Sequence, residues 1–184
     1  TQAMSSAASD VYKRQTKDQG IEQLYRDNRI TPIYEGTNSV QAADLVFRKL
    51  TNKNGDIIGK FLEMIKSECD GKNGKVKTFS EELNYYLDIL SKFTDWIKEK
   101  HNDDKDDVSA AANDYLKTLG FVSLAYSWIK VLDVSYNEYD NNKKFYDDKI
   151  NTAKFYFEKV LPRAELHYKS AISGSSNIMN FKFN

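Results

Sequence analysis

Residues 35–39, within the stretch IYEGTNSV, bring together side chains that could support acid–base chemistry. Glu35 lies between two helical patterns, so its carboxylate could project into a cavity and act as a general base. Gly36 has no side chain that would keep a ligand away from the backbone. Thr37 or Asn38 could cap a helix whose first amide groups bind a phosphate or carbonyl oxygen. The same pattern also fits a glutamate that only favours the positive end of a helix dipole.

The longer stretch around Glu35 resembles a known signature. Residues 25–50, YRDNRITPIYEGTNSVQAADLVFRKL, are similar to the carboxy-terminal signature of flavin-dependent acyl-CoA dehydrogenases. In that family a YRD-x-RI segment leads into IYEGTN and then into a helix with a glutamine and a late arginine. The resemblance continues in YLKTLGFVSLAYSWIKV and NTAKFYFEKVLPRAELHYKSAISGSSNIM, which look like the extra helical domain of one bacterial branch. That branch includes enzymes acting on long-chain or 3-methylmercaptopropionyl thioesters.

The resemblance implies roles for the residues that match the family's motif. Glu35 aligns with the catalytic base, which removes the α-proton of an acyl-CoA thioester while the β-hydrogen leaves as hydride to FAD. Gly36 aligns with a residue that lies against the substrate. Thr37, Asn38 and Ser39 align with the short segment that touches FAD.

The resemblance also implies a cofactor and partners. We expect FAD, an acyl-CoA substrate and an electron-transfer flavoprotein, together with a homo-oligomer of the full-length enzyme. Arg48 lies one position away from a substrate-contacting arginine of other branches, and we assign it no such role.

Several parts of the family pattern are missing from this sequence. SSAASDVYKRQ stands where the family has a glycine-rich flavin-binding segment, and the sequence contains neither the amino-terminal helical domain nor the middle β domain. We therefore expect a carboxy-terminal fragment that is inactive alone. Residues 1–15 share no apolar period with the residues that follow, and we expect a disordered or non-native leader there.

Apolar residues at three- and four-residue steps predict helices through most of the chain and an all-α, antiparallel helical bundle. Residues 16–50 would form the end of the acyl-CoA dehydrogenase C-terminal helical domain with the catalytic loop, and residues 51–184 an appended helical bundle domain. No strand-length alternating run competes with the helices. The expected helices cover approximately residues 16–29, 37–50, 56–69, 78–97, 108–134 and 145–172.

Individual residues predict where these helices begin, bend and end. Thr78 and Glu81 form a capping-box pattern, and the acidic run HNDDKDD predicts a solvated turn. Pro162 should kink the last helix, because it lacks an amide donor and crowds the carbonyl four residues earlier, and Gly174 should end it. The tail NIMNFKFN alternates and could dock as an extended strap. One helical face is predicted from Val40, Ala43, Phe47 and Leu50.

Aromatic side chains on the later helices fall mostly at helical spacing. We expect them in the core, with tyrosine hydroxyls reaching its rim, rather than around a cofactor. They are Tyr115, Phe121, Tyr126, Trp128, Phe155, Tyr156 and Phe157.

The composition argues against several classes of function. Lys plus Arg and Asp plus Glu both number 27 in 184 residues, so this neutral chain with interleaved charges does not indicate a nucleic-acid partner. No apolar run approaches the roughly 18 residues that span a bilayer. Cys69 is the single cysteine and His101 and His167 are the only histidines, so neither an internal disulfide nor a metal site is expected. The single cysteine favours a reducing, cytoplasmic setting.

Two hypotheses of different class follow from the sequence. The first is a fragment of an acyl-CoA dehydrogenase with Glu35 as its base. The second is a non-catalytic helical interaction or oligomerisation module, in which residues 76–172 serve assembly. An upstream reading frame that encodes a glycine-rich flavin-binding segment would favour the first, and a native start near Thr16 the second.

Overall fold

The computed structural model describes residues 21–29, 38–51 and 56–182. The chain divides into two units, residues 1–38 and residues 39–184. In its described residues the first unit contains α2 (Ile21–Asn28), where the Gln23 side-chain amide donates a 2.7 Å hydrogen bond to Asp27 one turn later.

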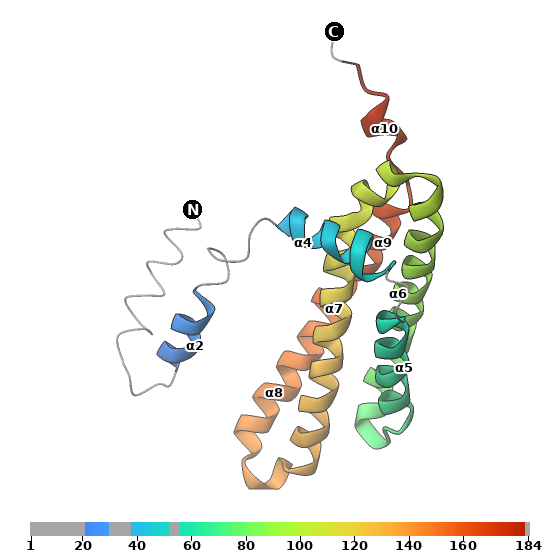
Figure 1. The fold of residues 1–184 in the computed structure, drawn as a ribbon. Coiled ribbons are helices and arrows are strands. Elements are labelled where there is room, and N and C mark those ends of the chain that lie inside the picture. The colour runs from blue at the N-terminus through green and yellow to red at the C-terminus, as the bar shows by residue number, and fades with distance from the viewer. Residues whose placement is uncertain (1–20, 30–37, 52–55, 183–184) are drawn as a thin grey trace. The chain divides into compact units, whose positions relative to one another are not determined.

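The described part of the second unit contains helices and turns but no strand, which confirms the predicted all-α fold class (Figure 1). The two longest helices, α6 and α7, run antiparallel and are separated by a single residue, Asp104. Two π-helical segments, η2 and η5, and two 3-10 turns, η3 and η4, connect the other helices. The elements in chain order are α4 (Asn38–Asp44), η2 (Leu45–Lys49), α5 (Ile57–Asp70), η3 (Gly74–Val76), α6 (Lys77–Asp103), α7 (Lys105–Asn137), η4 (Tyr139–Asn141), α8 (Lys143–Phe155), η5 (Tyr156–Val160), α9 (Arg163–Ala171) and α10 (Ser176–Met179).

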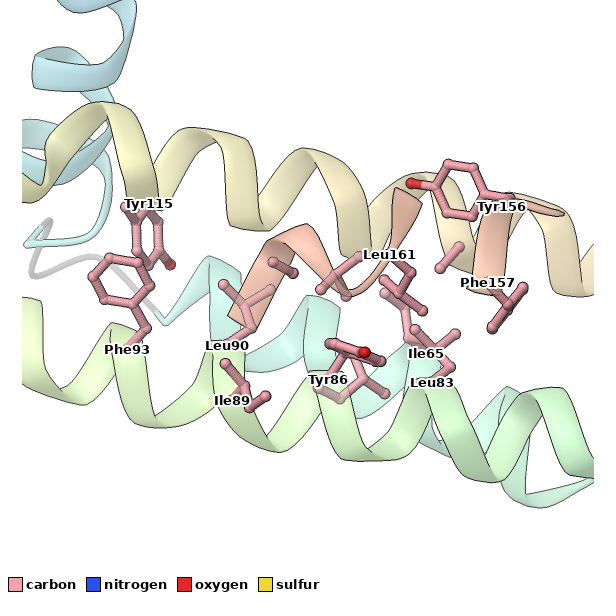
Figure 2. Close-up of a cluster of buried hydrophobic side chains, with 14 of the residues drawn as sticks. Ile65, Leu83, Tyr86, Ile89, Leu90, Phe93, Tyr115, Tyr156, Phe157 and Leu161 are labelled. Atoms are coloured by element: carbon pink, nitrogen blue, oxygen red, sulfur yellow. The ribbon is translucent and has the colours of Figure 1, made fainter. Parts of the chain in front are cut away.

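α7 is the central helix of this unit. It packs against α6, α8 and α9 and against the short segments η2, η3 and η5, whereas α5 packs against α6. α7 buries one broad face towards these neighbours, and its opposite face, which includes Ser109, Lys117 and Lys130, is exposed. Figure 2 shows buried side chains meeting between α6, α7 and the segment around Leu161. The largest fully buried side chains are Tyr115, Phe93, Phe157, Ile65, Leu83, Leu90, Ile97, Ile129, Leu132, Leu161, Val46 and Val108.

The buried hydroxyl of Tyr115 is paired inside this core. It lies 2.8 Å from Thr94 Oγ1, which in turn donates to the Leu90 carbonyl at 2.7 Å. Burial raises the pKa of the Tyr115 phenol above its usual value. The expectation that tyrosine hydroxyls reach the rim of the core is therefore wrong for Tyr115, although Tyr126 does donate to the exposed side chain of Glu68.

The boundary between α6 and α7 is sharper than predicted. α6 extends to Asp103 and α7 begins at Lys105, so the run HNDDKDD belongs almost wholly to helices. Asp104 makes this turn possible, because its carboxylate accepts hydrogen bonds from the backbone amides of Asp106 and Asp107 and so caps α7. The predicted solvated turn of seven residues is therefore wrong, because only Asp104 lies outside the two helices.

The start of α6 also differs from the prediction. Thr78 lies inside α6, which begins at Lys77, and Val76 stands at the N-cap position without a side-chain hydrogen bond. The predicted capping box is wrong. Gly74 has a φ of 61°, which glycine adopts without strain, and this lets η3 lead directly into α6.

Pro162 interrupts the last long helix, as predicted. α8 passes into the π-helix η5, and α9 begins only at Arg163. The Leu161 amide donates to the Tyr156 carbonyl at 2.9 Å, five residues back, so the hydrogen-bond ladder is already widened ahead of the proline. A π-turn of this kind is a common cause of a helix bend.

The buried face around Val40 is not the predicted one. Val40 is 62% exposed, and the buried residues recur four apart at Ala42, Val46 and Leu50. The π-helix η2 explains this spacing, because its i→i+5 hydrogen bonds widen the turn and move the apolar face along the helix. The prediction from ordinary helical spacing therefore holds for Leu50, which is buried, and in part for Phe47, which packs against the core, but not for Val40.

Most of the aromatic side chains predicted for the core are at least partly buried. Phe155 is the exception, since 59% of it is exposed. Those that are buried or packed against the core are Tyr115, Phe121, Tyr126, Trp128, Tyr156 and Phe157.

The tail begins with a short helix, and the described residues Phe181 and Lys182 that follow it are not helical. α9 ends at Ala171, Gly174 adopts a φ of 80°, and residues Ser176–Met179 form α10. The left-handed conformation of Gly174 suits a residue that ends a helix, as predicted. The predicted extended strap is wrong for α10, whose short turn is closed by hydrogen bonds back to Ser175 and Ser176.

Candidate functional site

The predicted site comprises residues 35–39 and leads into α4. Of these residues the structure describes only Asn38 and Ser39. Glu35, Gly36 and Thr37 lie outside the described residues, so their roles stay predictions. Asn38 and Ser39 are the first two residues of α4, and both are exposed.

A polar contact ties Ser39 to α7. Asn113 Nδ2 donates a hydrogen bond to Ser39 Oγ at 3.2 Å. A hydroxyl that accepts one hydrogen bond can still donate its own hydrogen, so Ser39 could hydrogen-bond a bound molecule at the same time. Asn113 could not be predicted as a partner of Ser39, because 74 residues separate the two and no local pattern marks their contact.

Apolar contacts fix the segment that follows Ser39. Ala42, Val46 and Leu50 are buried, and η2 packs against α7. Burying one Val or Leu side chain fully contributes about 1.5–3 kcal/mol, whereas a neutral hydrogen bond contributes about 1 kcal/mol net. The apolar side chains therefore hold α4 and η2 on the bundle, and the bond from Asn113 mainly orients the Ser39 hydroxyl.

Arg48 is engaged by a carboxylate on the same segment. Its guanidinium binds Asp44 through two nitrogens, with Nη2 2.9 Å from Oδ2, and Lys49 Nζ lies 3.5 Å from the same carboxylate. The hydrogen bond from Arg48 lowers the pKa of Asp44 below its usual value. Arg48 therefore has a carboxylate partner one turn earlier in the chain.

The two histidines lie between helices. His167 Nδ1 is 2.8 Å from Asp114 Oδ1, and its ring stacks on Phe121 with centroids 5.8 Å apart, so it joins α9 to α7. The His101 ring, in the last turn of α6, lies 5.7 Å from the ring of Phe47 in η2. Both contacts join one helical segment to another.

In residues 21–29, 38–51 and 56–182, no three His, Cys, Asp or Glu side chains gather in a way that could hold a metal ion. Among the helices of those same ranges, none is both long and apolar enough to cross a membrane.

The described half of the site offers groups that fit a nucleotide cofactor. The exposed Asn38 amide and Ser39 hydroxyl can both donate to and accept from phosphate or sugar oxygens. One hollow of about 390 Å³ lies at the base of α10, and another of about 490 Å³ lies among η3, α7, η4 and α8. Neither of these two hollows is lined by Asn38 or Ser39.

Two curated relatives are acyl-CoA dehydrogenases by name. A 3-methylmercaptopropionyl-CoA dehydrogenase from Ruegeria pomeroyi is 49% identical over 49 residues, which cover 27% of this chain and 8% of that protein. A broad-specificity linear acyl-CoA dehydrogenase, FadE5, from Mycobacterium tuberculosis is 25% identical over 161 residues, which cover 79% of this chain and 26% of that protein. The chain thus spans only a small part of the length of these relatives.

The helical bundle itself matches a protein family. The sequence model of the family described as "Acetyl-CoA dehydrogenase C-terminal like" matches residues 61–182. The matched residues run from within α5 past the end of α10 and make up more than half of the chain. The chain therefore belongs to the family of acetyl-CoA dehydrogenase C-terminal-like domains.

Proposed function

We propose that this chain is the carboxy-terminal part of an FAD-dependent acyl-CoA dehydrogenase, with Glu35 as the base for α,β-dehydrogenation of an acyl-CoA thioester. The observation that carries the proposal is that one chain contains the IYEGTN segment followed by the family's C-terminal domain at residues 61–182. The names of the two relatives support the substrate class, since both are acyl-CoA dehydrogenases.

Glu35 would remove the proton from the carbon next to the thioester carbonyl. Its backbone amide would donate a hydrogen bond to the carbonyl oxygen and stabilise the negative charge that develops there. A dry, apolar pocket would raise the pKa of the carboxyl, which suits a base that must accept a weakly acidic proton. FAD, when bound, accepts the β-hydrogen as hydride. Gly36 would let the substrate approach the backbone closely.

The proposal extends to cofactor contacts and partners. Thr37, Asn38 and Ser39 would contact FAD, and the exposure of Asn38 and Ser39 at the start of α4 supports this placement. Electron-transfer flavoprotein would receive the electrons from a cytoplasmic, homo-oligomeric enzyme. Because the chain spans a small part of its relatives' length, we propose that it needs the remainder of such a protein for activity.

Replacing Glu35 in the complete enzyme tests the assignment. Glu35→Gln keeps the size and polarity of the side chain but cannot take up the α-proton, so flavin binding should persist while flavin bleaching by acyl-CoA should slow by a factor of 100 or more, on the order expected for a lost general base. Glu81→Gln, at an exposed position of α6, is the matched control and should bleach at the normal rate. Near-normal bleaching in Glu35→Gln refutes the role of Glu35.

The isolated chain tests the second part of the proposal. We expect the purified protein of 184 residues to hold no stoichiometric flavin and to transfer no electrons from acyl-CoA to an artificial acceptor. Absorbance of bound flavin and dye reduction measure the two properties. A yellow, active preparation would show that the missing parts are not needed.

A further inference from the structure

Ser39 lies at the end of the face with which α4 and η2 pack on the bundle. Ser39, Ala42 and Val46 follow one another at helical spacing, so they lie on approximately one side of the segment. Ala42 and Val46 are fully buried, whereas Ser39 is exposed. η2 packs against α7 (Figure 1). The Ser39 hydroxyl therefore stands where the buried face ends, between a contact to α7 and the solvent.

The neighbours of Asn113 in α7 hold the helix backbone in place at this level. Tyr115 is fully buried, and its hydroxyl lies 2.8 Å from Thr94 Oγ1 in α6. Asp114 Oδ1 lies 2.8 Å from His167 Nδ1, which joins α7 to α9. The exposed side chain of Asn113 therefore projects from a backbone that two other helices fix, as a residue that positions another side chain requires.

The direction of the hydrogen bond from Asn113 decides how the Ser39 hydroxyl can act. Asn113 Nδ2 donates to Ser39 Oγ at 3.2 Å, so the serine oxygen is the acceptor in this contact. A serine hydroxyl has one hydrogen of its own to donate, and this contact does not use it. That hydrogen can therefore go to an acceptor oxygen of a bound molecule, such as a phosphate or sugar oxygen of a nucleotide.

We propose that Asn113 is a positioning residue for bound flavin, because it holds Ser39 as a hydrogen-bond donor to an acceptor oxygen of FAD. This inference rests on the proposed function, in which Ser39 contacts FAD. It adds to the site a residue of the domain that matches the family model, 74 positions after Ser39. Asn113 acts on the cofactor only through the serine hydroxyl.

The packing of α4 and η2 makes this role separable from a structural one. The buried Ala42 and Val46 hold the segment on the bundle, so Asn113→Ala should leave the urea midpoint of the chain nearly unchanged. Val46→Ala removes fully buried methyl groups and should lower the midpoint clearly. A loss of flavin affinity without a loss of stability therefore reports on the orientation of the Ser39 hydroxyl.

Titration of FAD into the flavin-free form of the complete enzyme, followed by flavin fluorescence, tests the proposal. Asn113→Ala should raise the Kd for FAD about fivefold, as expected for one ordinary hydrogen bond. Asn113→Asp places a carboxylate there that can only accept, so Ser39 must donate to it, and the Kd should rise at least as much. Asn151→Ala and Asn151→Asp make the same changes at an exposed position of α8 and should leave the Kd unchanged.

A double-mutant cycle shows whether Asn113 acts through Ser39. Ser39→Ala removes the hydroxyl and should raise the Kd for FAD about fivefold or more. In the Ser39→Ala enzyme, the further change Asn113→Ala should have no additional effect, because the hydroxyl that Asn113 positions is gone. Effects that multiply in the double variant would mean that the two side chains act independently.

The proposal is overturned if Asn113→Ala or Asn113→Asp binds FAD like the wild type, if the effects of Ser39→Ala and Asn113→Ala multiply, or if Asn113→Ala destabilises the chain as much as Val46→Ala. The titrations measure binding and not turnover, so they do not depend on Glu35 being the base. A complete wild-type enzyme that binds no FAD would overturn the proposed function together with this inference. Normal binding by the wild type, with an unchanged Kd in Asn113→Ala, would overturn this inference alone.

Discussion

The contact between Tyr115 and Thr94 allows the packing of α6 on α7 to be tested by a double-mutant cycle. Tyr115→Phe removes one hydroxyl but leaves Thr94 Oγ1 donating to the Leu90 carbonyl, so no buried donor loses its acceptor. We expect the free energy of unfolding to fall by about 0.5–1.5 kcal/mol. Thr94→Val leaves the hydroxyl of the fully buried Tyr115 without its partner, and we expect a loss of about 1–3 kcal/mol.

The double variant should lose less than the sum of the two single losses, by about 1 kcal/mol. The reason is that the second substitution removes a hydroxyl that the first has already left unpaired. Urea unfolding of all four proteins, followed by far-ultraviolet circular dichroism with a shared m-value, measures this difference. Thr152→Val, at an exposed position of α8, is the control. It measures how much a Thr-to-Val change in a helix lowers the free energy of unfolding when no buried partner is lost. Strictly additive losses would refute the reasoning, because they mean that the two hydroxyls do not meet in the folded protein.

Further predictions concern Asp107, which accepts a hydrogen bond from the backbone amide of Ser175, and two glycines. The hydrogen bond from Lys100 lowers the pKa of Asp107, so this carboxylate stabilises the fold above the unfolded aspartate pKa of about 3.9. That stability is lost as the pH falls through the lowered folded pKa. Asp107→Asn should therefore flatten the acid limb of a plot of Tm against pH, whereas the exposed control Asp95→Asn should not. Gly174→Ala should cost about 1–2 kcal/mol because of its φ of 80°. Gly120→Ala, with open space around the added Cβ in α7, should instead gain about 0.5–1 kcal/mol. Urea midpoints that shift in the same direction would contradict the glycine predictions.

Much of the fold could be predicted, because it depends on local chemistry. Helical spacing of apolar residues predicts the long helices, and Pro162 and Gly174 act through their own backbones, as expected. The turn at Asp104 was missed because an aspartate in an acidic run can solvate a loop or cap a helix, and the sequence does not distinguish the two. The buried face around Val46 was missed because a π-turn changes the spacing that the prediction assumed.

The candidate site is predicted from adjacent residues, whereas hydrogen bonds between distant parts of the chain could not be predicted in this way. The motif around Glu35 can be read from adjacent positions. The bond from Asn113 to Ser39 and the bond from Ser175 to Asp107 join residues that are 74 and 68 positions apart. Such pairs meet only because whole helices pack together, so no pattern within a single segment could predict them.

The length of α7 separates the region of α4 from the far end of the bundle. With a rise of about 1.5 Å per residue, the helix axis runs about 37 Å from Asn113, the partner of Ser39, to Glu138 at the C-cap. The 3-10 turn Tyr139–Asn141 follows immediately, and its last two residues, Asp140 and Asn141, are exposed. A fluorophore or an affinity handle attached at this turn would therefore report on the protein, or immobilise it on a surface, without crowding Ser39.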